Sequence, residues 1–474
     1  MTTAIWWVRR DLRLADNQAL AGALAQGGGL VPAFVLDPAL LGSSYVGDKR
    51  VASLFGSLRC LEEALRARGS RLVVRRGEPR AELAALLEAT GAAGVWAEED
   101  VSPYARRRDA AVADALPLHL TGGLTVHPPG AVRKADGDPY VVYTPFKGRW
   151  KALPRPAEGD LLPAPRSLPA VSDVEGVAIP EAPALPPAVP FPPGEDEARR
   201  RLDEFAGGEG AAVYRYARER DRLDREGTSR LSPYLRFGLV SARQAVVSAL
   251  AAAEAAGGED ERQGAETWLD ELIWREFYLQ ILYHFPRVRG TSFRAQYERI
   301  AWENDAGAFD AWCQGRTGYP VVDAAMRQLV RCGWMHNRAR MIVASFLVKD
   351  LLVDWRWGER FFMQHLVDGD PAANNGGWQW TAGTGTDAAP YFRIFNPVLQ
   401  GKKHDPEGAF VRRWMPELEG VPDRYVHAPW QMPAAVQREA GCVIGEDYPA
   451  PVIDHGWARE RTLAAYARAR EGAE

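Results

Sequence analysis

The prediction of the fold depends on residues 355–397, WRWGERFFMQHLVDGDPAANNGGWQWTAGTGTDAAPYFRIFNP. Four of the sixteen tryptophans lie between Trp355 and Trp380, and the polar run between them includes residues 368–370 and 374–377. Acidic and amide side chains are costly to bury without partners, whereas tryptophan gains much from burial. The mixture predicts a pocket around a flat ligand with polar edges, such as a fused-ring cofactor. Composition alone fits equally well a Gly- and Asn-rich loop that joins two aromatic core helices.

The motifs of this stretch resemble those of the DNA photolyase/cryptochrome family. DGDPAANNGGWQW (368–380) and GTDAAPYFRIFNP (385–397) match its flavin-binding signature. WLDELIWREFY (268–278), TGYPVVDAAMRQL (317–329) and GWMHNRAR (333–340) match the same family in the same order. The likeness begins at WVRRDLRLADN (7–17) and runs almost to the C-terminus, and it is closest to class I cyclobutane pyrimidine dimer photolyases.

Length and composition limit the remaining classes of protein. A chain of 474 residues exceeds one compact core, so we expect two domains. Hydrophobic residues at 46% and charged residues at 25% are typical of a soluble globular protein. Because no apolar run approaches the roughly 20 residues of a membrane span, and no signal peptide is evident, we expect a cytoplasmic protein.

Metal and disulfide chemistry are not indicated. The four cysteines are scattered without a CxxC pair, and the eight histidines show no HExxH spacing. We therefore expect no metal site. The net charge of −4 implies that any DNA binding uses a local basic patch.

The N-terminal part alternates apolar runs with amphipathic stretches, which predicts a parallel, five-stranded, doubly wound α/β sheet. The expected strands are residues 5–8, 30–36, 71–74, 94–97 and 124–126. Apolar residues at helical spacing between residues 51 and 65 predict a helix after the second strand. No GxGxxG follows the first strand, so a dinucleotide site of that kind is not indicated.

The resemblance supplies the domain organisation. It implies an antenna-chromophore domain at residues 1–130, an interdomain connection at 131–195 and an all-α FAD-binding catalytic domain at 196–474. Twelve of the thirty-four prolines lie in residues 154–193, which predicts an extended, irregular connection.

The resemblance also implies which residues bind FAD. Residues 228–232 match the segment that binds the diphosphate of the flavin, and Pro233 just inside a helix start independently favours exposed N–H groups there. The implied FAD-binding residues are Tyr216, Thr228, Ser229, Arg230, Leu231, Ser232, Trp268, Arg275, Asn337, Arg340, Asp368, Gly369, Asp370 and Asn374. Asn374 matches the position that faces flavin N5, and Arg340 paired with Asp368 is the expected electrostatic setting for an anionic reduced flavin.

The implied reaction is electron transfer from photoexcited, reduced, anionic FAD to a flipped-out cyclobutane pyrimidine dimer, which splits before the electron returns. Trp302, Trp355 and Trp378 match an electron-hopping chain that leads from the surface to the flavin. Glu271 matches the residue that hydrogen-bonds the lesion. For Trp312 we expect only a role in the core.

DNA contacts follow from the same resemblance. The implied DNA-binding residues are Arg220, Glu271, Trp274, Arg275, Tyr278, Asn337, Arg338, Met341, Trp380 and Gln400. The arginines between residues 199 and 225 also fit a solvated helix face balanced by acids. Relatives that repair six-four photoproducts carry two additional histidines where this chain has Asn337 and Met341, which favours the cyclobutane dimer as substrate and leaves His336 as a structural histidine.

A second chromophore is expected in the N-terminal domain. Asp37, residues 49–50 and the pattern around Tyr104 resemble members with a deazaflavin or FMN antenna more than members with methenyltetrahydrofolate. An empty site is the alternative. The expected partner is UV-damaged DNA containing pyrimidine dimers, without a membrane or a metal, and the chain is expected to be a monomer.

The alternative function is a cryptochrome-type blue-light photoreceptor that signals through a partner. Asn374 and the short extension after Tyr466 favour the lyase. A DASH-type protein is disfavoured by Trp380, and a dark flavin oxidoreductase would need a nicotinamide site that the sequence does not show.

Overall fold

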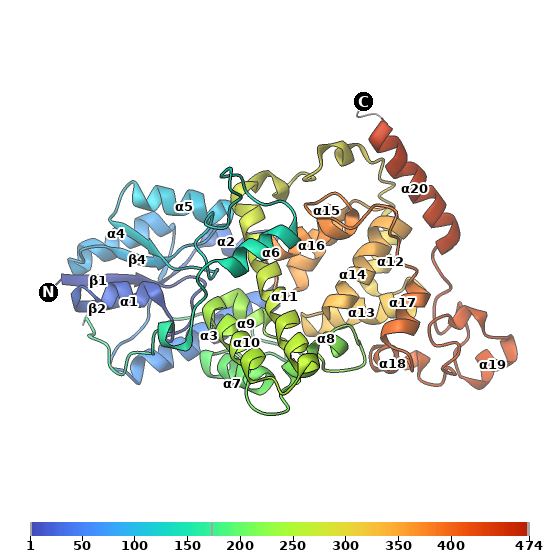
Figure 1. Cartoon of the computed structure of the whole chain (residues 1–474), viewed down its shortest axis with the longest axis horizontal. Coiled ribbons are helices and arrows are strands. Elements are labelled where there is room, and N and C mark those ends of the chain that lie inside the picture. Colours follow the sequence, from blue (N-terminus) through green and yellow to red (C-terminus); the bar gives the residue numbers. More distant parts are fainter. Residues whose placement is uncertain (1, 172–173, 472–474) are drawn as a thin grey trace. The chain divides into compact units, whose positions relative to one another are not determined.

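Five short apolar segments form a parallel sheet near the N-terminus. The computed structural model describes residues 2–171 and 174–471, and its strands are β1 (Thr2–Trp7), β2 (Gly27–Leu36), β3 (Val73–Arg76), β4 (Val95–Glu98) and β5 (Leu118–Thr121). The strand order is β3-β2-β1-β4-β5, with every neighbouring pair parallel. The inner strands read as continuous apolar runs because helices cover parallel sheets. The predicted α/β fold with a parallel five-stranded sheet is confirmed (Figure 1).

The predicted fifth strand was wrong. Residues 124–126 form a bend, and β5 lies at Leu118–Thr121 instead. Leu124 and Thr125 are buried and Val126 is half-buried, and the Val126 N–H donates to the carboxylate of Glu276 instead of to a neighbouring strand. β5 is an edge strand whose side chains are largely exposed, so its sequence carries no apolar run.

The helices between these strands begin with favourable N-terminal residues. They are α1 (Gln18–Leu24), α2 (Pro38–Leu41), α3 (Asp48–Arg66), α4 (Pro79–Thr90) and α5 (Pro103–Ala113). Asn17, Asp37 and Ser102 cap α1, α2 and α5, and proline opens α2, α4 and α5. The stripe predicted between residues 51 and 65 is confirmed in α3, where Leu58 and Leu61 are buried.

The proline-rich connection is irregular, as predicted. Its described residues between 153 and 194 contain one helical turn, η1 (Glu158–Asp160). The preceding residues 131–152 include helix α6 (Tyr143–Ala152). Proline prevents regular backbone hydrogen bonding along this stretch.

Helices dominate the chain after residue 194, which confirms the predicted all-α C-terminal part. Up to residue 284 these are α7 (Glu195–Ala206), α8 (Tyr216–Glu219), α9 (Ser232–Phe237), α10 (Ala242–Ala255) and α11 (Glu259–His284), with the turn η2 (Ala212–Arg215). They are followed by η3 (Pro286–Arg289), η4 (Ala295–Arg299), α12 (Ala306–Gln314), α13 (Pro320–Cys332), α14 (Asn337–Ser345), the π-helical η5 (Phe346–Asp350), α15 (Trp355–His365) and α16 (Pro371–Ala382). The last are α17 (Pro397–His404), α18 (Ala409–Trp414), η6 (Pro416–Leu418), η7 (Pro429–Gln431), α19 (Ala434–Glu439) and α20 (His455–Glu471).

Contacts divide the chain into two compact units. The first unit comprises Met1–Ala217, Thr228–Pro286 and Val367–Ala372. The second unit comprises Arg218–Gly227, Arg287–Leu366 and Ala373–Glu474. These units describe packing, and the predicted domain boundaries near residues 130 and 195 stay a prediction.

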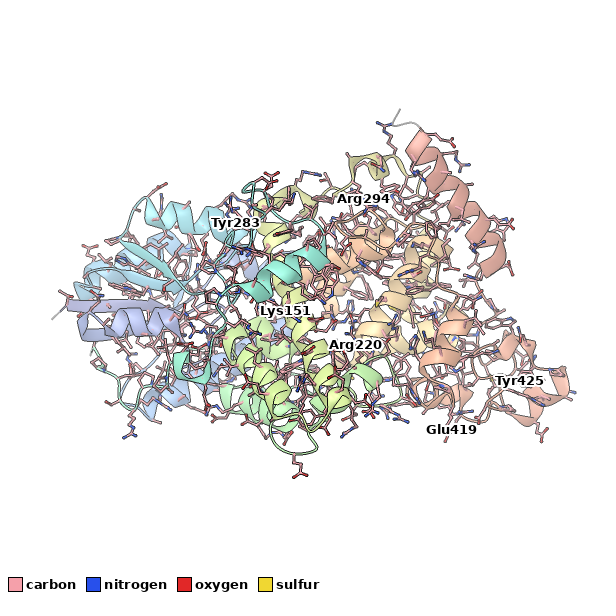
Figure 2. All side chains as sticks on the ribbon, viewed as in Figure 1. Lys151, Arg220, Tyr283, Arg294, Glu419 and Tyr425 are labelled. Atoms are coloured by element: carbon pink, nitrogen blue, oxygen red, sulfur yellow. The ribbon has the colours of Figure 1, made fainter. Side chains whose placement is uncertain are left out.

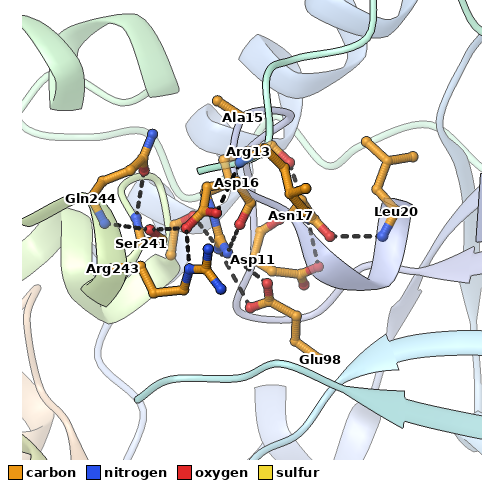
Figure 3. Close-up of polar contacts among 12 residues, drawn as sticks. Asp11, Arg13, Ala15, Asp16, Asn17, Leu20, Glu98, Ser241, Arg243 and Gln244 are labelled. Atoms are coloured by element: carbon orange, nitrogen blue, oxygen red, sulfur yellow. Dashed lines mark hydrogen bonds and ion pairs between the residues drawn. The ribbon is translucent and has the colours of Figure 1, made fainter. Parts of the chain in front are cut away.

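A buried polar network within the first unit joins the loop after β1 to the start of α10 (Figure 3). Ser241 caps α10 in a capping box with Gln244, and its hydroxyl donates to Asp16 at 2.6 Å. Arg13 contacts both carboxylate oxygens of Glu98 at the end of β4, at 2.5 and 3.4 Å. The sheet and α10 are therefore held by charge-assisted hydrogen bonds as well as by apolar packing.

The second unit has a large hydrophobic core built by α12 to α16 and α18. It includes Trp312, Trp355, Phe362 and Trp378. The prediction that Trp312 belongs to the core is confirmed, since its ring is fully buried and its Nε1 donates to the Val343 carbonyl at 3.0 Å. No helix in the described part of the chain is both long and apolar enough to cross a membrane.

Candidate functional site

Four arginines gather around Asp370 in the first unit. This arginine cluster is defined as Arg10, Arg50, Arg236 and Arg275, and Asp370 acts electrostatically on all four. Arg10, after β1, pairs with Asp370 at 2.5 Å and with Asp100, after β4, at 3.3 Å. The parallel sheet directs Arg10 and Asp100 to one edge because the carboxyl ends of its strands meet there.

Burial separates the arginine cluster from water, and the nearby carboxylates do not fully compensate for the lost solvation of its positive charges. Desolvation, with repulsion from Arg10, lowers the pKa of Arg236 to about 9. Desolvation also lowers the pKa of Arg50 to about 10 against the attraction of Asp368 and Asp370. Desolvation likewise lowers the pKa of Arg275. Guanidiniums in this condition gain from a bound anion such as a phosphate.

The segment 228–232 leads into α9 as the sequence predicts. α9 begins at Ser232 with Pro233 in its first turn, and Arg230 has a positive φ of 50°. Leu231 occupies the cap position, and no side chain caps the helix. Ser229 instead accepts from the N–H of Leu231 at 3.4 Å.

Two predicted flavin contacts meet on one aromatic side chain in the first unit. The ring of Phe205 in α7 lies edge-on to Tyr216, with centroids 5.9 Å apart, and to Trp268, with centroids 5.0 Å apart. Both partners are buried. Distant stretches of sequence therefore converge here through aromatic packing.

Helix α11 carries the predicted lesion contacts on a half-buried face. Glu271, Trp274, Arg275 and Tyr278 are all of intermediate exposure. One face of Trp274 stacks on Tyr143 of α6, with centroids 3.6 Å apart and ring planes 9° apart. Arg275 donates to the carbonyls of Leu124 and Leu235, so it is not a simple surface ion-pair residue.

The three tryptophans of the predicted chain share the core of the second unit. Trp355 and Trp378 are almost completely buried, and Trp302 packs against the same core from its edge. The indole Nε1 atoms of Trp355 and Trp378 are buried without a hydrogen-bond partner among the described residues. Buried N–H groups normally find a partner, so these two mark the place where a ligand could supply one.

Asn374 lies within α16, so the alternative of a Gly- and Asn-rich loop is wrong for this segment. Its Nδ2 donates to the backbone carbonyl and to the Oε1 of Glu359 in α15, both at 3.0 Å. Glu359 is buried, and desolvation raises the pKa of its carboxyl group against the opposing effects of Arg289 and Asn374. Because both hydrogen bonds to Glu359 use the Nδ2 of Asn374, its Oδ1 is the atom that can accept a hydrogen bond from a ligand.

The GWMHNRAR segment forms the start of α14. His336 caps this helix through its Nδ1, which accepts from the Arg338 N–H at 3.1 Å, so the prediction of a structural histidine is confirmed. Arg338 donates to both oxygens of Asp221, at 3.1 and 2.7 Å. Arg340 donates from Nε to the Met335 carbonyl at 2.8 Å. Arg340 belongs to the second unit and Asp368 to the first, and their expected pairing stays a prediction.

Near the predicted antenna site, the hydroxyl of Tyr104 in α5 donates to the carboxylate of Asp37, which follows β2. Burial and this carboxylate raise the pKa of Tyr104. Tyr104 and Asp37 therefore form a hydrogen-bonded pair at the carboxyl edge of the sheet.

Two family models match the chain. The model described as DNA photolyase matches residues 4–166, and the model described as the FAD binding domain of DNA photolyase matches residues 268–468. The chain belongs to the DNA photolyase family. Membership identifies it as an enzyme, a DNA-repair lyase with a FAD-binding domain.

Relatives of this photolyase-family chain are similar over its full length. The deoxyribodipyrimidine photo-lyase of Synechococcus sp. is 42% identical over 98% of the chain and 96% of the relative. That of Escherichia coli is 41% identical over 100% of both. A class III photolyase structure from Agrobacterium tumefaciens matches with a TM-score of 0.92 at 37% identity, over 99% of this chain and 98% of that one. A Synechocystis cryptochrome structure matches with a TM-score of 0.89 at 28% identity, over 98% of this chain and 99% of that one. The expected assignment to class I stays a prediction.

The photolyase motifs led to residues that the structure brings together in each unit, but they missed several partners. Glu359 and Asp221 hold Asn374 and Arg338, and Arg10, Arg50 and Arg236 complete the arginine cluster. A carboxylate at position 359 on an otherwise aromatic helix face was the one local signal. Arg10 lies in the matched stretch 7–17 and Arg50 in the antenna pattern, but neither pattern indicated a contact with Asp370.

Proposed function

We propose that the chain is a deoxyribodipyrimidine photo-lyase, a carbon–carbon lyase that splits cyclobutane pyrimidine dimers in UV-damaged DNA under blue light. The observation that carries this proposal is that relatives of that name align with the chain from end to end at about the same identity, 42% and 41%. A cytoplasmic, monomeric protein remains the expectation.

FAD fits the residues of the described chain. The arginine cluster brings one buried and three half-buried guanidiniums together with the carboxylates of Asp100, Asp368 and Asp370, which suits a diphosphate. The segment 228–232 would contribute N–H groups and hydroxyls to the same anion. Tyr216 and Trp268, which pack on Phe205 in the same unit, would contact the cofactor as well.

When bound in its reduced, anionic form, FAD supplies the light absorption and the electron that open the cyclobutane ring. Asn374 would accept from the flavin edge, because Glu359 holds its Nδ2 and leaves its carbonyl oxygen available. A neutral amide there offers no proton, which preserves the anionic state. Trp302, Trp355 and Trp378 would carry the electron inward when the cofactor is oxidised.

Lesion recognition would fall to α11. A dimer that leaves the helix stack needs an apolar platform and hydrogen-bonding groups for its exposed edges. Trp274 is held on one face by Tyr143, so its orientation is set before DNA arrives. Glu271 would accept from the N–H groups of the dimer or, once protonated, donate to its carbonyls. Tyr278, Met341, Trp380 and Gln400 would complete the contacts.

Phosphates would be bound by basic residues of the second unit, among them Arg220 (labelled in Figure 2) and Arg338. Burial opposes ionisation of Asp221, but Arg338 outweighs it and lowers the pKa of this carboxyl group. A DNA phosphate must therefore compete with Asp221 for Arg338. Asn337 is exposed beside it and can contribute to the same contact.

A flavin-type antenna is the second part of the proposal. Asp37 and Tyr104 offer a hydrogen-bond acceptor and a donor at the carboxyl edge of the sheet, outside the arginine cluster. A relative whose structure matches with a TM-score of 0.80 at 30% identity, over 98% of this chain and 99% of that one, is an archaeal photolyase from Sulfolobus tokodaii with two FAD molecules. We favour FMN or a deazaflavin over methenyltetrahydrofolate.

The deciding experiment is a blue-light assay on DNA that carries either a cyclobutane dimer or a six-four photoproduct, with a dark control. We expect repair of the dimer alone and only in the light. Glu271→Ala should lower repair while FAD stays bound. Repair in the dark, or none in the light by a protein that contains reduced FAD, would exclude the lyase.

The second candidate is a blue-light photoreceptor, favoured by the structural match to a Synechocystis cryptochrome. It predicts a light-dependent spectral change without dimer repair. The same assay separates the two functions.

A further inference from the structure

A cavity of about 320 Å³ lies at the carboxyl edge of the sheet in the first unit. The loop after β1, the ends of β4 and β5 and the first turn of α10 line it, and Figure 3 shows the wall around Arg13 and Glu98. None of the described residues that line it belongs to the arginine cluster or to the pair of Tyr104 and Asp37. Because open α/β sheets bind ligands outside the carboxyl ends of their strands, the cavity lies where a ligand is expected.

Arg13 brings an unpaired donor to this cavity. Its side chain is almost completely buried, and its two terminal nitrogens donate to Glu98 and to the carbonyls of Asp16 and Gly238. Its Nε is also buried, but it has no hydrogen-bond partner among the described residues. A buried N–H beside a cavity is stabilised by a molecule that offers it an acceptor.

Three further side chains around the cavity are open to hydrogen bonding. Glu99 is half-buried, and desolvation raises the pKa of its carboxyl group although Arg106 opposes the effect. In the described part of the chain no group donates to this carboxylate, and the amide of Gln18 and the hydroxyl of Thr121 make no hydrogen bond either. Gln18 lies directly against the turn after β5, where Gly122 has a φ of 57° and leaves no room for a Cβ. The cavity therefore offers both donors and acceptors.

The charges around the cavity disfavour a simple ion as its ligand. The lining carries the carboxylates of Asp16, Glu98 and Glu99 and the guanidiniums of Arg13 and Arg243. A phosphate would meet three acids and an ammonium ion would meet two arginines, so an ion of either sign faces like charges at short range. The described lining also includes no aromatic ring on which a nucleobase would stack. A neutral molecule with several hydroxyls avoids both difficulties, because each hydroxyl donates and accepts.

We propose that this cavity binds a neutral polyol about the size of a pentose. The Nε–H of Arg13 donates to one ligand oxygen, and the two oxygens of Glu99 accept from neighbouring hydroxyls, as an acidic residue of a dinucleotide-binding sheet does with ribose. Gln18 and Thr121 bind the remaining hydroxyls. The cavity volume of about 320 Å³ is at the lower end of the range for small-molecule sites, roughly 300–1,000 Å³, and suits a monosaccharide. The inference goes beyond the proposed repair function and does not depend on it.

The test is ligand-observed NMR on the full-length protein with bound FAD, kept in the dark. D-ribose and ribitol are the neutral probes and are read by saturation-transfer difference. 1,4-Diaminobutane and glycine represent a cation and a zwitterion in the same measurement, and the line width of the phosphorus signal reports inorganic phosphate. We expect ribose and ribitol to bind and to compete with each other, and the three charged probes not to bind.

Two variants link this binding to the cavity. Glu99→Ala should weaken ribose binding about tenfold or more, because hydrogen bonds to a charged acceptor are lost. Thr121→Val removes one hydroxyl at nearly constant shape and should weaken binding less. Glu88→Ala is the matched control, because it removes an exposed carboxylate of α4 outside the cavity, and it should bind ribose like wild type. Melting temperatures establish that each variant is folded.

The remaining outcomes contradict the proposal. Binding of phosphate, diaminobutane or glycine instead of the polyols would overturn the neutral ligand class. Ribose binding that is unchanged in both Glu99→Ala and Thr121→Val would place the polyol outside this cavity. Binding of none of the probes would mean that the cavity holds only water.

Discussion

Glu98 is a buried acid whose ionisation should affect stability. Desolvation raises its pKa to about 7 against the attraction of Arg13, and Asp11 and Asp16 raise it further. In the unfolded chain the pKa is about 4.3. Between these values the folded state keeps a proton that the unfolded state has lost, so stability falls as the pH rises through this window.

We predict that Glu98→Gln removes this pH dependence, because glutamine stays neutral at every pH. The melting temperature of the variant relative to wild type should rise between about pH 5 and about pH 8, the window set by the two pKa values. Thermal unfolding followed by circular dichroism at several pH values measures the difference. Two parallel curves would show that Glu98 does not titrate in this range.

Glu359 orients Asn374, so replacing Glu359 should affect both the stability of the protein and the rate of repair. Glu359→Leu leaves the half-buried amide of Asn374 with the backbone carbonyl of residue 359 but without its side-chain acceptor, a loss of about 0.5–1.5 kcal/mol for one hydrogen bond. We expect a lower melting temperature and slower dimer repair. Glu359→Gln retains an acceptor oxygen and should stay close to wild type, and equal damage from both substitutions would mean that packing, not the hydrogen bond, is what Glu359 provides.

At the scale of elements, α15 packs against α16 without a side chain at Gly358. A Cβ there would meet the Cη2 of Trp378 at 2.1 Å and the Cδ2 of Leu347 at 2.6 Å. Because neither the buried indole nor the helix backbone can move freely, the close approach of the two helices requires glycine.

We predict that Gly358→Ala destabilises the protein by about 1–3 kcal/mol, the usual range for overpacking a core. The same change displaces Trp378, so photoreduction of bound FAD should slow as well. Gly148→Ala in α6 is the control, because its Cβ would meet nothing within 4 Å, and removing a helical glycine there should be neutral or stabilising. Melting temperatures and flash photolysis report both effects, and an unchanged Gly358→Ala would mean that the helices can separate without cost.

The whole molecule carries a net charge of −4, so its attraction for DNA must come from a local patch rather than from its overall field. The pairing of Arg338 with Asp221 limits that patch in the free protein. Undamaged DNA should bind weakly, and binding should fall steeply as salt rises, since each phosphate contact releases counterions.

We predict that Asp221→Asn tightens binding to undamaged DNA and steepens the salt dependence by about one phosphate contact, because it frees Arg338. Asp423→Asn removes the same charge from a different ion pair, with Arg412, and serves as the control. Fluorescence anisotropy across a salt series measures both variants. Equal tightening by the two would point to net charge rather than to Arg338.

Local pattern was enough to predict many elements of this protein. The apolar run of β2, the stripe of α3 and the proline-rich connection each carry their signal within one short window, because burial on a sheet or on one helix face repeats along the chain. The sequence did not predict β5, because an exposed edge strand has no apolar run. Residues 124–126 were mistaken for the strand, although their contacts are with residues outside the sheet.

The sequence by itself determined the family, the fold class and the identity of the aromatic and amide residues, since these depend on motifs and on periodic burial. Only the tertiary structure decided which polar groups and rings face one another: Asp370 among four arginines, Glu359 beside Asn374, Asp221 on Arg338, and Tyr143 on Trp274. Electrostatic and ring contacts depend on distance in space, and residues far apart in the chain carry no local mark of the partner that folding brings to them.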